Sequence, residues 1–163
     1  MGRSRFGLPL HHPAALVATW LGAGLLPWAP GTWGSFAALP CAWVIVHFAG
    51  PAALAVTAMI VFALGWWAAG RLAAASGHED PGFIVVDEVA AQWLVLALAP
   101  LDWRAYAAAF VLFRVFDITK PWPARAIERR VKGGLDIMLD DIVAALYAVL
   151  LVLIGEGVFG VRP

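Results

Sequence analysis

Four carboxylates lie within ten residues of one stretch of this chain, which runs from His78 to Glu88. The chain as a whole is 63% hydrophobic and only 13% charged, so acids are concentrated here to an unusual degree. Asp87 and Glu88 stand at the start of an apolar segment, where an ionised carboxylate is costly unless it is paired, hydrated or bound to a cation. We therefore expect this pair to have a functional role.

Further acids in two other stretches could join them in binding a metal ion. Hard divalent cations such as Mg²⁺ take oxygen ligands, usually one or two carboxylates together with waters and substrate phosphate. No spacing of Cys and His in the chain suits zinc. All the candidate ligands of Mg²⁺ except Asp140 are also candidates for the catalytic base or nucleophile. The six are Asp80, Asp87, Glu88, Asp117, Asp140 and Asp141.

Cationic and hydroxyl side chains in two stretches are suited to binding a phosphate group. Arg114 and Lys120 lie three residues before and after Asp117, so they would project near the same helix end. An arginine can bind phosphate bidentately, and a lysine supplies a compact charge. Thr32 and Ser35 belong to a glycine-rich turn before a predicted helix, where hydroxyls and backbone N–H groups can bind an anion. These residues predict phosphoryl chemistry, either by a metal-activated water or through an aspartyl-phosphate.

Each of these motifs also has a simpler interpretation. Asp140 and Asp141 could begin a helix, where acidic side chains interact favourably with the helix dipole. Arg114 and Asp117 could form a structural ion pair at helical spacing. The hydroxyls of the glycine-rich turn could be helix caps. Such an interpretation fits Asp87 and Glu88 least well, because burying two neighbouring carboxylates as structural partners costs free energy.

The apolar segments that must position these residues are long and rich in alanine and leucine, and they lack the period-two alternation of strands. The mean hydropathy is +0.83, well above that of an ordinary soluble protein. We predict one all-α domain over residues 1–163, a multihelical bundle and polytopic membrane protein with four or five transmembrane or membrane-embedded helices. The helices are expected near residues 34–50, 52–70, 84–101, 104–118 and 142–159.

Threading these helices through a bilayer places most charges on one side. Nine of the eleven Lys and Arg residues and nine of the eleven acids share that side, which the positive-inside rule makes cytoplasmic. The net charge of zero argues against a nucleic-acid partner. Two alternatives stay open: a small cation transporter or channel that uses interfacial carboxylates, and a soluble helical metal-dependent phosphohydrolase. The oligomeric state is also open.

Four motifs, spread over residues 19–141, together resemble the phosphatidylglycerophosphatase A family. The resemblance implies a Mg²⁺-dependent phosphatase of the bacterial inner membrane that hydrolyses phosphatidylglycerophosphate to phosphatidylglycerol and phosphate. It also implies an all-α multihelical fold with the motif carboxylates at the metal site. The motifs are Thr19-Trp20 to Pro27 with Ala29 to Ser35, Asp80-Pro81 to Asp87-Glu88, Phe113 to Pro121, and Gly133-Gly134 to Asp140-Asp141.

Overall fold

The computed structural model describes residues 7–78, 81–122 and 134–159, and these residues form helices joined by short turns, without a strand among them. This confirms the all-α prediction. The elements are α1 (Pro13–Ala18), the short 3-10 helix η1 (Ala23–Leu25), α2 (Pro30–Ser76), α3 (Val86–Leu96), α4 (Trp103–Thr119) and α6 (Gly134–Phe159).

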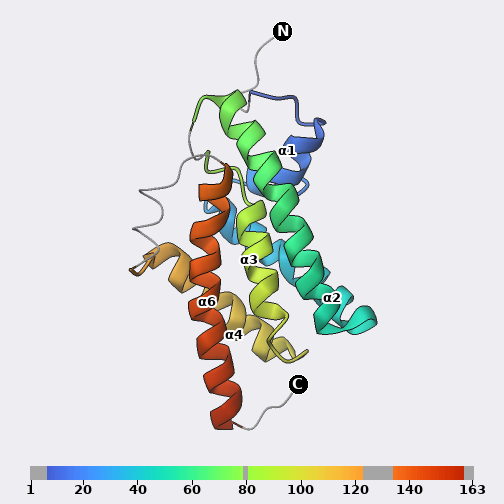
Figure 1. Ribbon diagram of the computed structural model, residues 1–163, viewed down its shortest axis with the longest axis vertical. Helices are drawn as coiled ribbons and strands as arrows, with labels where there is room; N and C mark the ends of the chain where they lie inside the picture. The colour runs from blue at the N-terminus through green and yellow to red at the C-terminus, as the bar shows by residue number, and fades with distance from the viewer. Residues whose placement is uncertain (1–6, 79–80, 123–133, 160–163) are drawn as a thin grey trace.

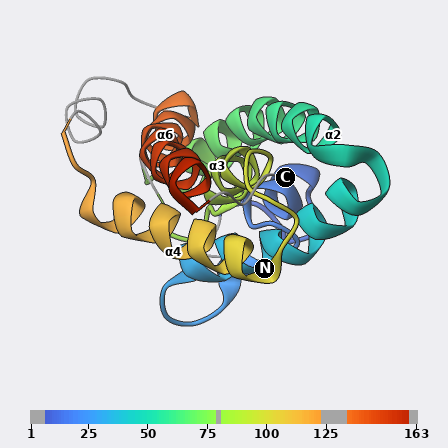
Figure 2. The ribbon, with the colours of Figure 1, turned by 90° about the horizontal axis from the view of Figure 1, so that it is seen from below.

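Helix α3 is the centre of the molecule. Figure 2 shows α2, α4 and α6 arranged around it. All of its residues except Glu88 and Leu94 are buried, including the acidic Asp87. Because α3 is enclosed in this way, side chains near its first turn face residues from every surrounding helix.

Helix α2 is bent at Gly50, so its two halves follow different directions (Figure 1). Gly50 adopts a φ of 83°, a conformation that favours glycine, and Pro51 lacks an amide hydrogen. The two helices predicted at 34–50 and 52–70 are therefore present as the halves of one bent helix.

Two of the other predicted helix boundaries are wrong. Helix α3 ends at Leu96 rather than near 101, and α6 begins at Gly134 rather than near 142. A Cβ on Gly134 would lie 2.5 Å from the backbone of α2 at Trp66 and Gly70. Because glycine permits this close approach, the helix can start here, within the stretch between the helices predicted near 104–118 and 142–159. Four basic residues of this stretch lie outside the described residues: Arg125, Arg129, Arg130 and Lys132.

The prediction of four or five membrane spans is not confirmed. Two of the described helices, α2 and residues Gly134–Gly155 of α6, are long and apolar enough to cross a membrane. Helix α3 has 11 residues, about 17 Å of helix, which is short of the roughly 30 Å hydrocarbon core. Large apolar side chains are nevertheless exposed along both candidate spans, among them Phe48, Met59 and Leu146. Such a surface favours a membrane protein.

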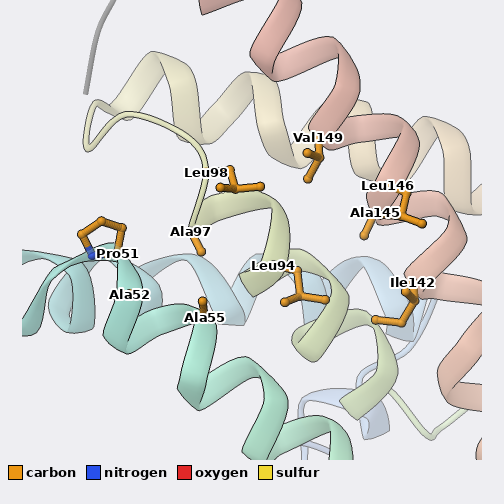
Figure 3. A pocket seen from close by; sticks show the side chains of 10 residues that line it. All are labelled: Pro51, Ala52, Ala55, Leu94, Ala97, Leu98, Ile142, Ala145, Leu146 and Val149. Carbon is orange, nitrogen blue, oxygen red and sulfur yellow. The ribbon is translucent and has the colours of Figure 1, made fainter.

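An apolar cavity of about 460 Å³ lies between the second half of α2, the end of α3 and the middle of α6 (Figure 3). It is lined by proline, alanine and larger aliphatic side chains alone, including Pro51, Leu94 and Val149. Another lining residue, Ile142, directly follows Asp141 in α6. One of the residues that line the cavity is therefore next in sequence to a predicted site residue.

Candidate active site

Three carboxylates converge where α3 and α6 run side by side. Asp87 and Glu88 lie in the first turn of α3, and Asp141 lies in the second turn of α6. One oxygen atom of each carboxylate lies within 4.8 Å of those of the other two. The helix packing thus brings together acids from two distant motifs, as the sequence predicted. We call these three residues the carboxylate cluster.

Burial makes the α3 acids of this cluster hold their protons strongly. Burial, followed by the negative charges of Glu88 and Asp141, raises the pKa of Asp87 well above its usual value of 3.8. Burial also raises the pKa of Glu88 from 4.5 to about 7, although its hydrogen bond with Asp87 opposes this increase. One oxygen of each cluster residue is buried without a hydrogen-bond partner among the described residues. The positive charge of Arg114, which lowers the pKa of Glu88, therefore compensates for the burial of these acids only in part.

Arg114 approaches the cluster from the last turns of α4. Its Nη1 lies 2.5 Å from Asp117 Oδ2 and 3.7 Å from Glu88 Oε1. The same nitrogen donates a hydrogen bond of 3.4 Å to the hydroxyl of Ser35, which is fully buried. Arg114 and Asp117 do form the ion pair that helical spacing suggests, but the arginine also connects this pair to α2 and α3.

The end of α4 contacts α6 through a second pair of charges. Lys120 adopts a left-handed conformation that ends α4, and its ammonium forms an ion pair with Asp140. The buried side chain of Asp117 lies beside Asp141. Among the described residues, five carboxylates from three helices therefore face two cationic side chains, which leaves an excess of negative charge.

The first turn of α2 lies directly against Glu88 because residue 31 is a glycine. A Cβ at Gly31 would lie 1.8 Å from Glu88 Oε1 and 3.3 Å from Arg114 Nη1. A side chain at this position is therefore incompatible with the observed place of Glu88.

We expect Gly31→Ala to lower the activity by about 10²-fold, the effect of displacing a site group by around 1 Å. Gly155→Ala is the matched control, because a Cβ there meets no atom within 4 Å. Phosphate release and thermal unfolding should be measured on both variants. Wild-type activity in Gly31→Ala would show that the position of Glu88 does not matter.

The remaining predicted residues differ in their relation to the site. Asp80 lies outside the described residues. Thr32 is half-buried in the first turn of α2, and its hydroxyl forms no hydrogen bond with the described part of the chain. Ser35 donates to the carbonyl of Gly31, 3.0 Å away. Neither hydroxyl caps α2, because its N-cap residue is Ala29, so the interpretation as helix caps is wrong.

The interpretation of Asp140 and Asp141 as the start of a helix is also wrong. Helix α6 begins at Gly134, so both acids lie within the helix and beyond its first turn. An interaction with the helix dipole falls off within the first turn and does not account for them.

One polar residue at this site was missed by the sequence analysis. Gln92 lies one helical turn beyond Glu88 and is completely buried, yet neither its Nε2 nor its Oε1 has a partner among the described residues. The available signal was a single amide within the apolar segment 89–99, four residues after an acid.

The carboxylate cluster fits a hard divalent cation. Its donors are carboxylate oxygens alone, which suit Mg²⁺ rather than a softer metal. The unpartnered oxygens of Asp87, Glu88 and Asp141 are buried acceptors that a cation would satisfy. Mg²⁺ would therefore be held by these three residues, with Asp140 and Asp117 next to them.

Comparison with known proteins identifies related sequences. Residues 16–156 match the family model described as phosphatidylglycerophosphatase A. The chain is 39% identical to a phosphatidylglycerophosphatase A of Haemophilus influenzae, covering 89% of this chain and 90% of that protein. It is 40% identical to the Escherichia coli protein of that name, covering 85% of this chain and 81% of that protein. The chain is also 40% identical to a Bacteroides thetaiotaomicron protein that is provisionally named a phosphatidylinositol-3-phosphatase. That match covers 89% of this chain and 94% of that protein. No solved structure matches the chain.

Proposed function

This chain belongs to the phosphatidylglycerophosphatase A family, and we propose that it hydrolyses phosphatidylglycerophosphate to phosphatidylglycerol and phosphate with the aid of Mg²⁺. Membership of this family makes the chain a phosphatase that acts on a phosphate monoester, which disfavours the alternative of a cation channel. The observation that carries the proposal is the carboxylate cluster with Arg114 beside it. Acidic metal ligands next to a phosphate-binding cation are the parts that phosphoryl transfer requires.

Different residues of the site would bind the phosphate, hold the cation and accept a proton. Arg114 and Lys120 would bind the phosphate oxygens, and the carboxylate cluster would hold the cation. When bound, Mg²⁺ would polarise a phosphoryl oxygen and lower the pKa of a water. Asp117 lies beside both Arg114 and Asp141, so it could accept a proton as the water oxygen bonds to phosphorus. The bond from phosphorus to the glycerol oxygen breaks, and the proton returns to that oxygen. Attack by an aspartate is the competing route.

The apolar cavity supports a phospholipid as the substrate. It lies between α2, the end of α3 and α6, and one of its lining residues, Ile142, directly follows Asp141 (Figure 3). A lipid whose phosphate bound at the cluster would then have an apolar site for an acyl chain nearby. Cavities of this size and apolar character are typical of ligand sites. We commit to an acyl chain of the substrate as its occupant.

We expect Ala52→Phe, which fills the exposed side of this cavity, to lower kcat/KM for a long-chain substrate about tenfold, the equivalent of roughly 1.4 kcal/mol. A short-chain analogue should be hydrolysed at the wild-type rate. Val56→Phe is the matched control, because Val56 is exposed on the same half of α2 and does not line the cavity. Equal losses for both chain lengths would place the acyl chain elsewhere.

We further place the enzyme in the bacterial inner membrane with its site facing the cytoplasm. The two candidate spans and the bacterial relatives support a membrane location. Most of the charged residues of the chain belong to the side that the positive-inside rule makes cytoplasmic. This side is where the site residues at the start of α3 and the end of α4 would lie.

The test is phosphate release by purified protein from phosphatidylglycerophosphate in vesicles, with phosphatidylinositol 3-phosphate as the comparison lipid. We expect the first lipid to be hydrolysed with the higher kcat/KM. A clear preference for the inositol lipid would support a phospholipid phosphatase activity but refute phosphatidylglycerophosphate as its substrate. Hydrolysis of neither lipid, by protein that remains folded, would refute the proposal.

A further inference from the structure

The segment that joins α1 to α2 exposes large apolar side chains, and the proposed function assigns it no role. Trp28 is 91% exposed, Leu21 is 80% exposed, and Leu26 is exposed as well. Figure 2 shows the segment that leads into α2 as a loop that projects from the bundle. Single exposed apolar residues are common, but a group of them on one loop marks an interaction surface. We call residues 21–29 the apolar loop.

The backbone of the apolar loop is strained where its most exposed side chains are attached. Leu21, Trp28 and Ala29 have φ values of 55°, 60° and 48°, in the left-handed region that is unfavourable for a residue with a Cβ. Exposing an apolar side chain on a strained backbone does not stabilise the fold, and strain of this kind is typical of functional segments. The exposure of Trp28 therefore indicates a contact with something outside the protein.

Two close backbone contacts hold the apolar loop beside the carboxylate cluster. A Cβ on Gly24 would lie 2.2 Å from the carbonyl oxygen of Phe83, which precedes α3 by three residues. Directly after the loop, Gly31 lies against Glu88 in a similar way. Because both ends of this region pack on residues at the start of α3, whatever covers the apolar loop lies next to the cluster.

The interfacial region of a lipid bilayer is the partner that fits this surface. The chain contains no Asp, Glu, Lys or Arg between His12 and Arg71, so the loop lacks the charges that belong to the polar rim of a protein–protein interface. Tryptophan is enriched where membrane and water meet. The exposed apolar surface also continues into α2, a candidate membrane span, through Trp33 and Phe36. A surface continuous with a lipid-facing helix is covered by lipid.

We propose that the apolar loop inserts into the interfacial region of the bilayer and thereby holds the carboxylate cluster at the depth of the lipid phosphates. Apolar side chains of interfacial segments enter the boundary between headgroups and acyl chains, and Trp28 would lie there. A substrate lipid could then reach the cluster with its acyl chains still in the membrane. This benefit for catalysis rests on the proposed function, whereas the insertion of the loop does not.

The test of the catalytic benefit replaces Trp28 by glycine, which removes the exposed ring and suits the left-handed backbone. We expect Trp28→Gly to keep or raise the Tm and to lower kcat/KM for long-chain phosphatidylglycerophosphate in vesicles at least about tenfold. A short-chain analogue dissolved in water should be hydrolysed at the wild-type rate. Phe48→Ala is the matched control, because Phe48 is 81% exposed at the opposite end of the first half of α2, and it should change neither rate.

The insertion itself can be measured without any activity. Trp28→Cys in a Cys41→Ser background carries the only thiol of the chain, to which an environment-sensitive fluorophore can be attached. In vesicles we expect lipids that carry a spin label near the headgroup to quench this fluorophore, and iodide in the water not to quench it. Quenching by iodide would place the loop in water. A fluorophore shielded from both quenchers would mean that protein covers the loop.

Either of the last two results would overturn the proposal. Wild-type kcat/KM in Trp28→Gly, or equal losses for the vesicle lipid and the short-chain analogue, would also overturn it, because the loop would then not place the cluster at the lipid phosphates. Failure of the wild type to hydrolyse phosphatidylglycerophosphate, with the fluorophore quenched by the labelled lipids, would refute the substrate and retain the insertion of the loop.

Discussion

Asp141→Asn is expected to lower phosphate release by at least about 10³-fold while the protein stays folded in the membrane. The substitution keeps the size of the side chain and removes the negative charge that connects α6 to the carboxylate cluster. Removing one group that stabilises the transition state electrostatically costs about 10²–10³-fold in other enzymes, and Asp141 would act in this way through the cation that it holds. Asp87→Asn should have the same effect, because Asp87 belongs to the same cluster.

Stability should change in the opposite direction. The cluster acids are buried with unpartnered oxygens, so an uncharged amide relieves part of their desolvation cost. We therefore expect both variants to have a Tm at or above that of the metal-free wild type. Asp102→Asn is the matched control: Asp102 is an exposed N-cap of α4, and asparagine caps helices equally well. An active Asp141→Asn, or a loss of equal size in Asp102→Asn, would contradict the assignment of the cluster.

The meeting of the acidic motifs could be predicted from the sequence because it follows from helix topology. Charged residues at the ends of long apolar segments have to gather at the same side of a bundle, and the structure brings Asp87, Glu88, Asp117 and Asp141 together in this way. Composition and periodicity were sufficient to predict an all-α chain. Predicting the gathering of the charges and predicting the all-α class do not require knowing which side chains contact each other.

What could not be predicted depends on contacts between backbones. Helix α6 begins early because Gly134 can pack on Gly70, and local sequence does not reveal the partner of a glycine. The bend at Gly50 similarly joins two predicted helices into one. The complete burial of Gln92 was missed because only the packing around α3 shows it. The four or five predicted membrane spans are not confirmed, because apolar segments that enclose a central helix resemble segments that face lipid.

Removal of divalent cations is expected to abolish activity, and addition of Mg²⁺ to restore it. Burial raises the pKa values of Asp87 and Glu88, and one oxygen of each cluster acid is buried without a hydrogen-bond partner among the described residues. Purified protein in EDTA should therefore release no phosphate, although its Tm shows that it remains folded. Because EDTA does not cross membranes, it should inhibit inverted membrane vesicles and leave right-side-out vesicles active if the site faces the cytoplasm.

The pH dependence of Mg²⁺ binding gives this prediction a second measurement. The pKa of Glu88 is raised to about 7, so below this pH the carboxyl holds a proton that the cation must displace. The Mg²⁺ concentration that gives half-maximal activity should therefore fall as the pH rises from 6 toward 7, by up to about tenfold per pH unit for one displaced proton. Above the pKa the contribution of Glu88 to this dependence should level off, because Glu88 is already ionised. Activity that is indifferent to EDTA would remove the metal from the mechanism. A Mg²⁺ requirement that does not change between pH 6 and 8 would remove Glu88 from its ligands.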